Sequence, residues 1–204
     1  MGKHKNSADA KIWAQLKAKE LGWVFTPSDL AGLGSRTAVA TALKRYKATG
    51  RLRQVARGLY CRVDSGTAVG PTVDAVIRAV KDRDAVRLQP SGAYAANQLG
   101  LSDQVPMRVV FLTDGRQQRI KLGKMEILFK RTTPRNMATA GRVSGLVIQA
   151  FRWLGQRQAV AAADKLKALL DAPAKNQLLA DARHAPVWMA KLFHSIAEPA
   201  GKGR

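Results

Sequence analysis

The chain has 204 residues, enough for one large domain or two small ones, each with a hydrophobic core of its own. Its composition, 46% hydrophobic and 24% charged residues, is typical of a globular protein and excludes a disordered one. The charge is unusual, because 35 Lys and Arg against 14 Asp and Glu give a formal net charge of +21. Such an excess predicts binding to a polyanion, and nucleic acid is the commonest.

The sequence contains no targeting motif and no cluster of metal ligands. No stretch approaches the ~20 apolar residues that cross a membrane, and the N-terminal residues MGKHKNSADA have no apolar segment like that of a signal peptide. The single cysteine, Cys61, excludes an internal disulfide, and the three histidines do not have zinc-ligand spacing. We therefore expect a cytoplasmic protein that binds no metal, no cofactor and no membrane.

The N-terminal region begins with two predicted helices. Residues 8–21 place apolar side chains at near-helical spacing, and Gly22 ends this segment. The second helix begins at Thr26, the expected N-cap, and Asp29 stands three residues later, where its carboxylate can reach back to the cap. This second helix is short and is expected to stop by Gly32 or Gly34.

A third helix and a hairpin complete this region. Ser35 is the expected N-cap of a helix that ends at Gly50. Residues 53–63, RQVARGLYCRV, then predict two short strands around a turn at Arg57 and Gly58. Three helices followed by a two-stranded hairpin are typical of a winged helix-turn-helix domain, in which the third helix enters the DNA major groove.

The third helix has the composition of a DNA-reading helix. Val39, Leu43 and Tyr46 gather on one side, the other side holds small, hydroxyl and basic side chains, and no acidic residue occurs from residue 35 to 50. We expect base contacts near the start of this helix and phosphate contacts beyond it. The expected base contacts are Arg36, Thr37, Thr41 and Lys44, the expected phosphate contacts are Arg45 and Lys47, and the remaining DNA-binding residues are Ser35, Arg53 and Arg57.

The hairpin predicts the environment of the cysteine. Leu59, Cys61 and Val63 share one face of the outgoing strand, so Cys61 is expected to be a packed thiol. The incoming strand alternates less regularly. Arg57 stands at the tip, from which we expect it to reach the DNA backbone or the minor groove.

A turn-rich stretch at residues 64–71 divides the chain into a winged helix-turn-helix domain at 1–65 and a second domain at 66–204. The second domain predicts three successive strands that form an antiparallel meander, preceded by helices and followed by a helical C-terminus, so the fold class is α+β. The expected helices are 72–81, 91–101, 142–154, 158–171, 174–183 and 186–197, and the expected strands are 85–88, 107–113, 118–122 and 125–130.

The meander carries a second concentration of positive charge, with Glu126 as its one acidic residue. This cluster is either a second surface for a polyanion or a solvated sheet edge that its cations protect from pairing. Its members are Arg116, Arg119, Lys121, Lys124, Lys130, Arg131 and Arg135.

No stretch of the sequence carries a catalytic motif. Gly32-Leu33-Gly34 lacks the further glycines and the preceding strand of a phosphate-binding loop. Asp82 and Asp84 flank Arg83 at the end of a predicted helix, where a turn or capping role fits better than acid–base catalysis. We therefore expect a binding protein and not an enzyme.

Three segments of the sequence stand out: Gly22-Trp23-Val24-Phe25-Thr26-Pro27-Ser28-Asp29-Leu30, Arg57-Gly58-Leu59-Tyr60 and Pro90-Ser91-Gly92-Ala93-Tyr94-Ala95-Ala96-Asn97-Gln98-Leu99-Gly100-Leu101. In these segments the chain resembles the AbiEi-type antitoxins of bacterial type IV (abortive infection) toxin–antitoxin systems. The resemblance covers roughly residues 8–155 and includes the order of helices and strands; no motif accounts for the last fifty residues.

This resemblance implies an antitoxin that also represses its own operon by binding repeats in the promoter. Its functional partner would be a nucleotidyltransferase toxin, which the family antagonises without a stable complex. Repeats in the operator imply two or more protomers on the DNA. The alternative is a basic structural or RNA-binding protein that uses the winged helix and the basic sheet for RNA or protein contacts.

Overall fold

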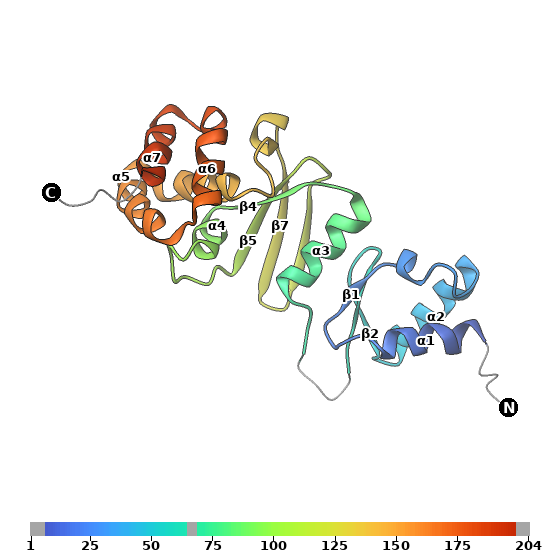
Figure 1. Cartoon of the computed structure of the whole chain (residues 1–204). Coiled ribbons are helices and arrows are strands. Elements are labelled where there is room, and N and C mark those ends of the chain that lie inside the picture. The colour runs from blue at the N-terminus through green and yellow to red at the C-terminus, as the bar shows by residue number, and fades with distance from the viewer. Residues whose placement is uncertain (1–6, 65–68, 199–204) are drawn as a thin grey trace. The chain divides into compact units, whose positions relative to one another are not determined.

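The structure is a computed structural model that describes residues 7–64 and 69–198 (Figure 1). Within these residues the fold is α+β, as predicted, with seven α-helices and two small sheets. The chain forms two compact units, residues 1–85 with 120–122 and residues 86–119 with 123–204. The predicted boundary at residue 65 differs from this division, because the helix after the turn-rich stretch groups with the first unit. Residues 65–68 of that stretch lie outside the described residues.

In the first unit, three helices and a 3₁₀ turn surround a small antiparallel sheet with the strand order β1-β3-β2. Ile12, Leu16, Phe25, Leu43 and Tyr46 form the centre of its core and join the first two α-helices to the sheet. The elements are α1 (Ala8–Lys17), β1 (Val24–Phe25), η1 (Pro27–Leu30), α2 (Arg36–Ala48), β2 (Leu52–Ala56), β3 (Leu59–Arg62) and α3 (Val73–Asp84).

The predicted helix starts are confirmed, but two of the helices are shorter than expected. The carboxylate of Asp29 accepts hydrogen bonds from the Thr26 backbone N–H at 2.7 Å and from its hydroxyl at 2.9 Å. The helix after this cap is only the 3₁₀ turn η1, and α1 ends at Lys17, before the predicted end at residue 21. The Ser35 hydroxyl accepts from the Ala38 N–H at 3.2 Å, which caps α2 as the sequence predicts.

The hairpin forms where the sequence places it. Gly58 has φ +70°, the left-handed conformation that a tight turn needs and that glycine adopts without strain. The pairing of β2 with β3 shifts register between Gln54 and Ala56, which explains why the incoming strand alternates irregularly. Leu59 and Cys61 are fully buried, so the predicted packed thiol is confirmed.

The second unit contains most of a four-stranded sheet and a helical C-terminal half (Figure 1). Residues 120–122 of the edge strand of this sheet are grouped with the first unit. α5, α6 and α7 contact one another, and α4 packs on α5. The elements are β4 (Leu88–Ser91), α4 (Ala93–Gln98), β5 (Arg108–Thr113), β6 (Gln118–Leu122), β7 (Met125–Arg131), η2 (Pro134–Met137), α5 (Val143–Leu169), α6 (Ala172–Asp181), η3 (Ala182–His184) and α7 (Val187–Ala197).

The predicted antiparallel meander is wrong. The strand order is β4-β5-β7-β6, and β5 runs parallel to β7, so the sheet is mixed. Burial explains the order: β7 contributes the buried Ile127 and Phe129, whereas β6 contributes only Ile120 between two exposed cations. The more apolar strand takes the interior position, and the basic strand takes the edge, where cations oppose pairing with other chains.

The helical C-terminus is confirmed. Gly155 has φ +76° and ψ 164°, which interrupts α5 between the two segments that the sequence separates. At the start of α5, the Ser144 hydroxyl donates to Asp181 Oδ2 at 2.5 Å, and Arg142 Nη1 lies 2.8 Å from Asp181 Oδ1. These two partners compensate the buried Asp181 carboxylate and fasten α6 to α5.

Candidate nucleic-acid interface

A groove of about 660 Å³ runs along α2 in the first unit. The opposite side of the groove comes from η1, from the hairpin turn at Gly58 and from Arg83 at the end of α3. Arg36, Lys44 and Lys47 line it from α2, together with the small side chain of Ala40. The helical side of the groove therefore carries three cations beside the apolar side chains of Val39, Ala40 and Leu43.

The exposed side of α2 combines cations with hydroxyl groups. Its buried side consists of Val39, Ala42, Leu43 and Tyr46, in agreement with the predicted apolar face. The opposite side exposes Ser35, Arg36, Thr37, Thr41, Lys44 and Lys47. Among the described residues, no carboxylate forms a salt bridge with the cations of this side.

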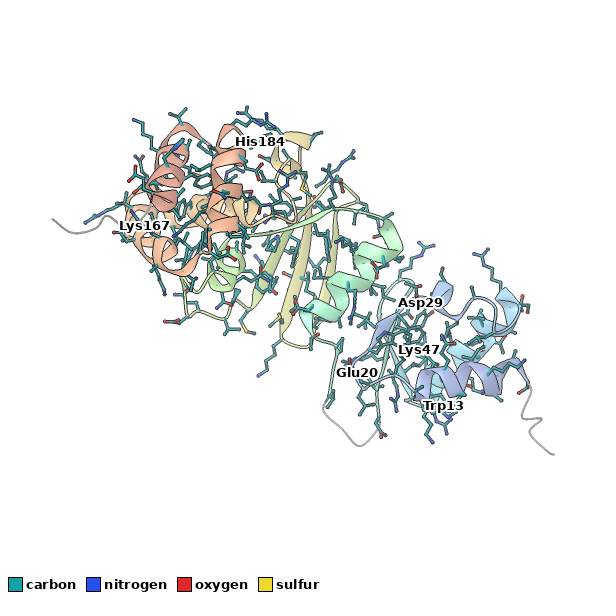
Figure 2. All side chains as sticks on the ribbon, in the orientation of Figure 1. Trp13, Glu20, Asp29, Lys47, Lys167 and His184 are labelled. Carbon is teal, nitrogen blue, oxygen red and sulfur yellow. The ribbon has the colours of Figure 1, made fainter. Side chains whose placement is uncertain are left out.

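Lys47 (labelled in Figure 2) connects α2 with the hairpin. Its Nζ donates to the Gln54 side-chain oxygen at 3.1 Å. Gln54 is opposite Tyr60 in the β2–β3 ladder, and Tyr60 also lines the groove. The helix and one face of the hairpin thus meet at the groove.

Arg45 lies apart from the other cations of α2. Its guanidinium forms a salt bridge with Asp9 of α1 and lies over the Tyr46 ring, with 5.3 Å from Cζ to the ring centroid. The Tyr46 hydroxyl donates to Asp9 Oδ1 at 2.7 Å, and burial raises the pKa of this tyrosine. Arg45 therefore joins α2 to α1 and does not line the groove.

Arg53 also lies away from the groove. It pairs in register with Cys61, whereas Leu52 and Gln54, on the other face of β2, contact the core and Lys47. Burial raises the pKa of the Cys61 thiol to about 11, and the nearby positive charge of Arg53 opposes part of that rise. The structure thus associates Arg53 with the buried thiol.

The turn of the hairpin is held from α3. The Arg57 side chain is exposed at the tip, and the backbone carbonyl of Arg57 accepts a hydrogen bond from Arg83 Nη1 at 2.9 Å. Arg83 forms a fork with its neighbour Asp84, with Nε to Oδ1 and Nη2 to Oδ2 both at 2.7 Å. Sequence reasoning missed this residue, because a contact between positions 26 apart leaves no periodic signal, and the Asp-Arg-Asp triplet resembles an ordinary helix end.

The residues of the predicted second basic surface lie on β6, on β7 and in the segments next to these strands. Its seven cations are all exposed. Arg119 and Lys121 alternate with the buried Ile120 on β6. Glu126 forms salt bridges with Arg108, at 2.9 Å, and with Arg119, at 3.1 Å, so the acidic residue of the region sits between two arginines. Lys130 shares the strand face of Glu126, whereas Arg131 lies on the opposite face.

The described part of the chain contains no group of three or more His, Cys, Asp or Glu placed to hold a metal ion. The helices within residues 7–64 and 69–198 include none that is both long and apolar enough to cross a membrane.

The profile of a family of unknown function (DUF6088) matches residues 11–178, which include every residue of the groove. The chain belongs to this family. No curated protein sequence matches it. The match ends within α6, so α7 lies beyond the matched residues.

Proposed function

We propose that the protein is a transcriptional repressor that binds double-stranded DNA with α2 in the major groove and the β2–β3 hairpin as a wing. The observation that carries this proposal is the exposed side of α2, where three cations that have no carboxylate partner among the described residues line an open groove. DNA binding draws much of its free energy from cations that replace counterions on phosphates, and an unpaired cation is available for this exchange.

The order of side chains along α2 supports a division between base and phosphate contacts. Thr37, Thr41 and Lys44 lie on the exposed side in the first two-thirds of the helix, with Ala40 between them to allow close approach. Hydroxyl and amino groups bind base edges in the major groove. Lys47 and the wing residue Arg57 lie farther along and are assigned to phosphates on either side.

The resemblance to AbiEi-type antitoxins supports a biological role. On this proposal the protein is a cytoplasmic antitoxin that represses its own operon by binding promoter repeats, with more than one protomer on the DNA. It antagonises a nucleotidyltransferase toxin without forming a stable complex. A nucleotidyltransferase gene next to the gene of this protein would support that role, and its absence would argue for a repressor of another operon.

Footprinting on the DNA upstream of its own gene tests DNA reading. We expect protected repeats, and we expect binding to a random duplex to be weaker by at least about 10³-fold at physiological salt. Thr41→Val or Lys44→Met should change which base pairs are preferred within the repeat. Equal affinity for the upstream DNA and for the random duplex would contradict the proposal.

One observation favours the alternative, an RNA-binding protein. Arg119, Lys121 and Lys130 are exposed on the four-stranded sheet, and a basic sheet face can bind structured RNA by shape. Direct competition between the upstream duplex and a structured RNA of equal length separates the two. Preference for the RNA, lost on replacing these three residues by alanine, would establish the alternative.

A further inference from the structure

Two features of the hairpin weaken its own hold on the tip. The register shift between Gln54 and Ala56 interrupts the ladder just before the turn. A Cβ added at Gly58 would meet nothing within 4 Å, so the turn is open on that side. A bulged ladder and an open turn leave the direction of the tip weakly determined by the hairpin alone.

Arg83 of α3 supplies a contact that the hairpin lacks. Its Nη1 donates to the backbone carbonyl of Arg57 at 2.9 Å, and its side chain is only 15% exposed. Asp84 accepts from Nε and Nη2 of the same guanidinium, both at 2.7 Å. A planar guanidinium that is held by a fork on one edge presents its remaining N–H groups in a fixed direction.

We propose that Arg83 is a positioning residue, which holds the wing tip so that the Arg57 side chain and the cations of α2 meet the same DNA duplex. This inference rests on the proposed DNA-binding function. Arg83 lines the groove, yet its charge is paired with the Asp84 carboxylate, so it is not assigned to a phosphate. It acts on DNA through the backbone of Arg57, and Asp84 orients it.

A double-mutant cycle on duplex affinity tests this role. The variant is Arg83→Met with Asp84→Asn, because Arg83→Met alone would leave a carboxylate beside the groove. Arg78→Met, at an exposed position of the same helix, is the matched control for the loss of a cation from α3. Each variant is measured in the wild-type and in the Arg57→Ala background, over a range of salt concentrations.

We expect the Arg83/Asp84 variant to weaken binding about eightfold at 0.1 M salt and to lower the salt slope by about 0.9, as Arg57→Ala does, because each removes one phosphate contact. In the Arg57→Ala background it should change the affinity less than about twofold, because the contact is already lost. The Arg78→Met control should leave binding unchanged. If the Arg83/Asp84 variant lowers the affinity by a further eightfold in the Arg57→Ala background, the positioning role is overturned. It is also overturned if this variant, in the wild-type background, binds the duplex as tightly as Arg78→Met does.

Amide hydrogen exchange in the free protein tests the contact without DNA. Exchange of residues 54–60 should rise about tenfold or more in the Arg83/Asp84 variant, the effect of losing one charge-assisted hydrogen bond, and should stay unchanged in Arg78→Met. Unchanged exchange in the Arg83/Asp84 variant would overturn the inference even if DNA binding is established. Faster exchange together with no duplex binding by the wild-type protein would overturn the proposed function instead.

Discussion

The exposed side of α2 and the sheet face around Glu126 are both rich in cations, but they differ in how those cations are paired. On α2, Arg36, Lys44 and Lys47 have no carboxylate partner within the described residues. On the sheet, Glu126 forms salt bridges with both Arg108 and Arg119. The net charge of +21 therefore includes cations of two kinds, those of α2 without a carboxylate partner in the described residues and those of the sheet that form salt bridges. A cation that already has a carboxylate partner contributes less binding free energy when it contacts a phosphate than a cation that is surrounded by water and counterions.

Removing two cations from each surface tests whether the two surfaces contribute differently to duplex affinity. We expect Lys44→Ala with Lys47→Ala to weaken duplex binding roughly sixtyfold at 0.1 M salt, because Lys47 loses a phosphate contact worth about eightfold and Lys44 loses a base contact worth about the same factor. The salt slope should fall by about 0.9, the share of the one phosphate contact. The matched pair, Arg119→Ala with Lys121→Ala, should change the affinity less than about threefold, since charges that do not contact phosphate act only through a screened field. Titration by fluorescence anisotropy at several salt concentrations measures both effects. Equal losses from the two pairs would mean that the whole charge of the protein binds DNA without a defined site.

A second test is to release the paired arginines of the sheet. Glu126→Gln removes the partner of Arg108 and Arg119, so we expect the affinity for a structured RNA to rise, by up to about eightfold at 0.1 M salt. The measurement uses the Lys44→Ala, Lys47→Ala background, in which the contribution of α2 is reduced. Glu198→Gln, an equal change of charge at an exposed position after α7, is the control. An equal rise in both variants would show that net charge, and not the pairing at Glu126, limits binding.

The difference between the two surfaces also shows what could be predicted from the sequence. Local signals sufficed for α2, because the Ser35 cap, the apolar stripe ending at Tyr46 and the absence of acids all lie within one segment. The alternation of the outgoing hairpin strand likewise predicted the buried Cys61.

Contacts between distant segments could not be predicted. Arg45 and Lys47 lie on opposite flanks of α2, and only the position of Asp9 on another helix shows that the Arg45 flank is paired. The meander was wrong because strand order depends on a competition in burial between β6 and β7, which neighbouring turns do not reveal. The Arg83 contact with the hairpin depends on where α3 packs, and α3 was assigned to the other domain.

Arg45 and Lys47, two nearby cations of α2, should contribute differently to duplex affinity. Arg45→Ala should change duplex affinity less than about twofold, because Arg45 is paired with Asp9, whereas Lys47→Ala should weaken it about eightfold at 0.1 M salt. Arg45→Ala should instead cost up to about 1 kcal/mol of stability, the usual range for a half-exposed ion pair. Binding titrations and urea unfolding of the two variants provide the comparison. A larger loss of affinity in Arg45→Ala than in Lys47→Ala would place the DNA on the α1 side of α2.

The smallest effect concerns the two faces of the hairpin. Arg53 was expected to contact DNA, but it lies on the face of β2 that is paired with Cys61, so Arg53→Ala should change duplex affinity less than about twofold.

The same substitution should raise the pKa of Cys61 above its present value of about 11, because the Arg53 charge favours the thiolate. The buried thiol stabilises the fold below its ordinary pKa of 9.0, and this stabilisation is lost as the pH rises through about 11. Since Cys61 is the only cysteine, the ¹³Cβ shift of labelled cysteine reports its titration alone. An unchanged pKa together with an eightfold weaker, less salt-dependent complex would mean that Arg53 contacts phosphate, and the interface would then include both faces of the hairpin.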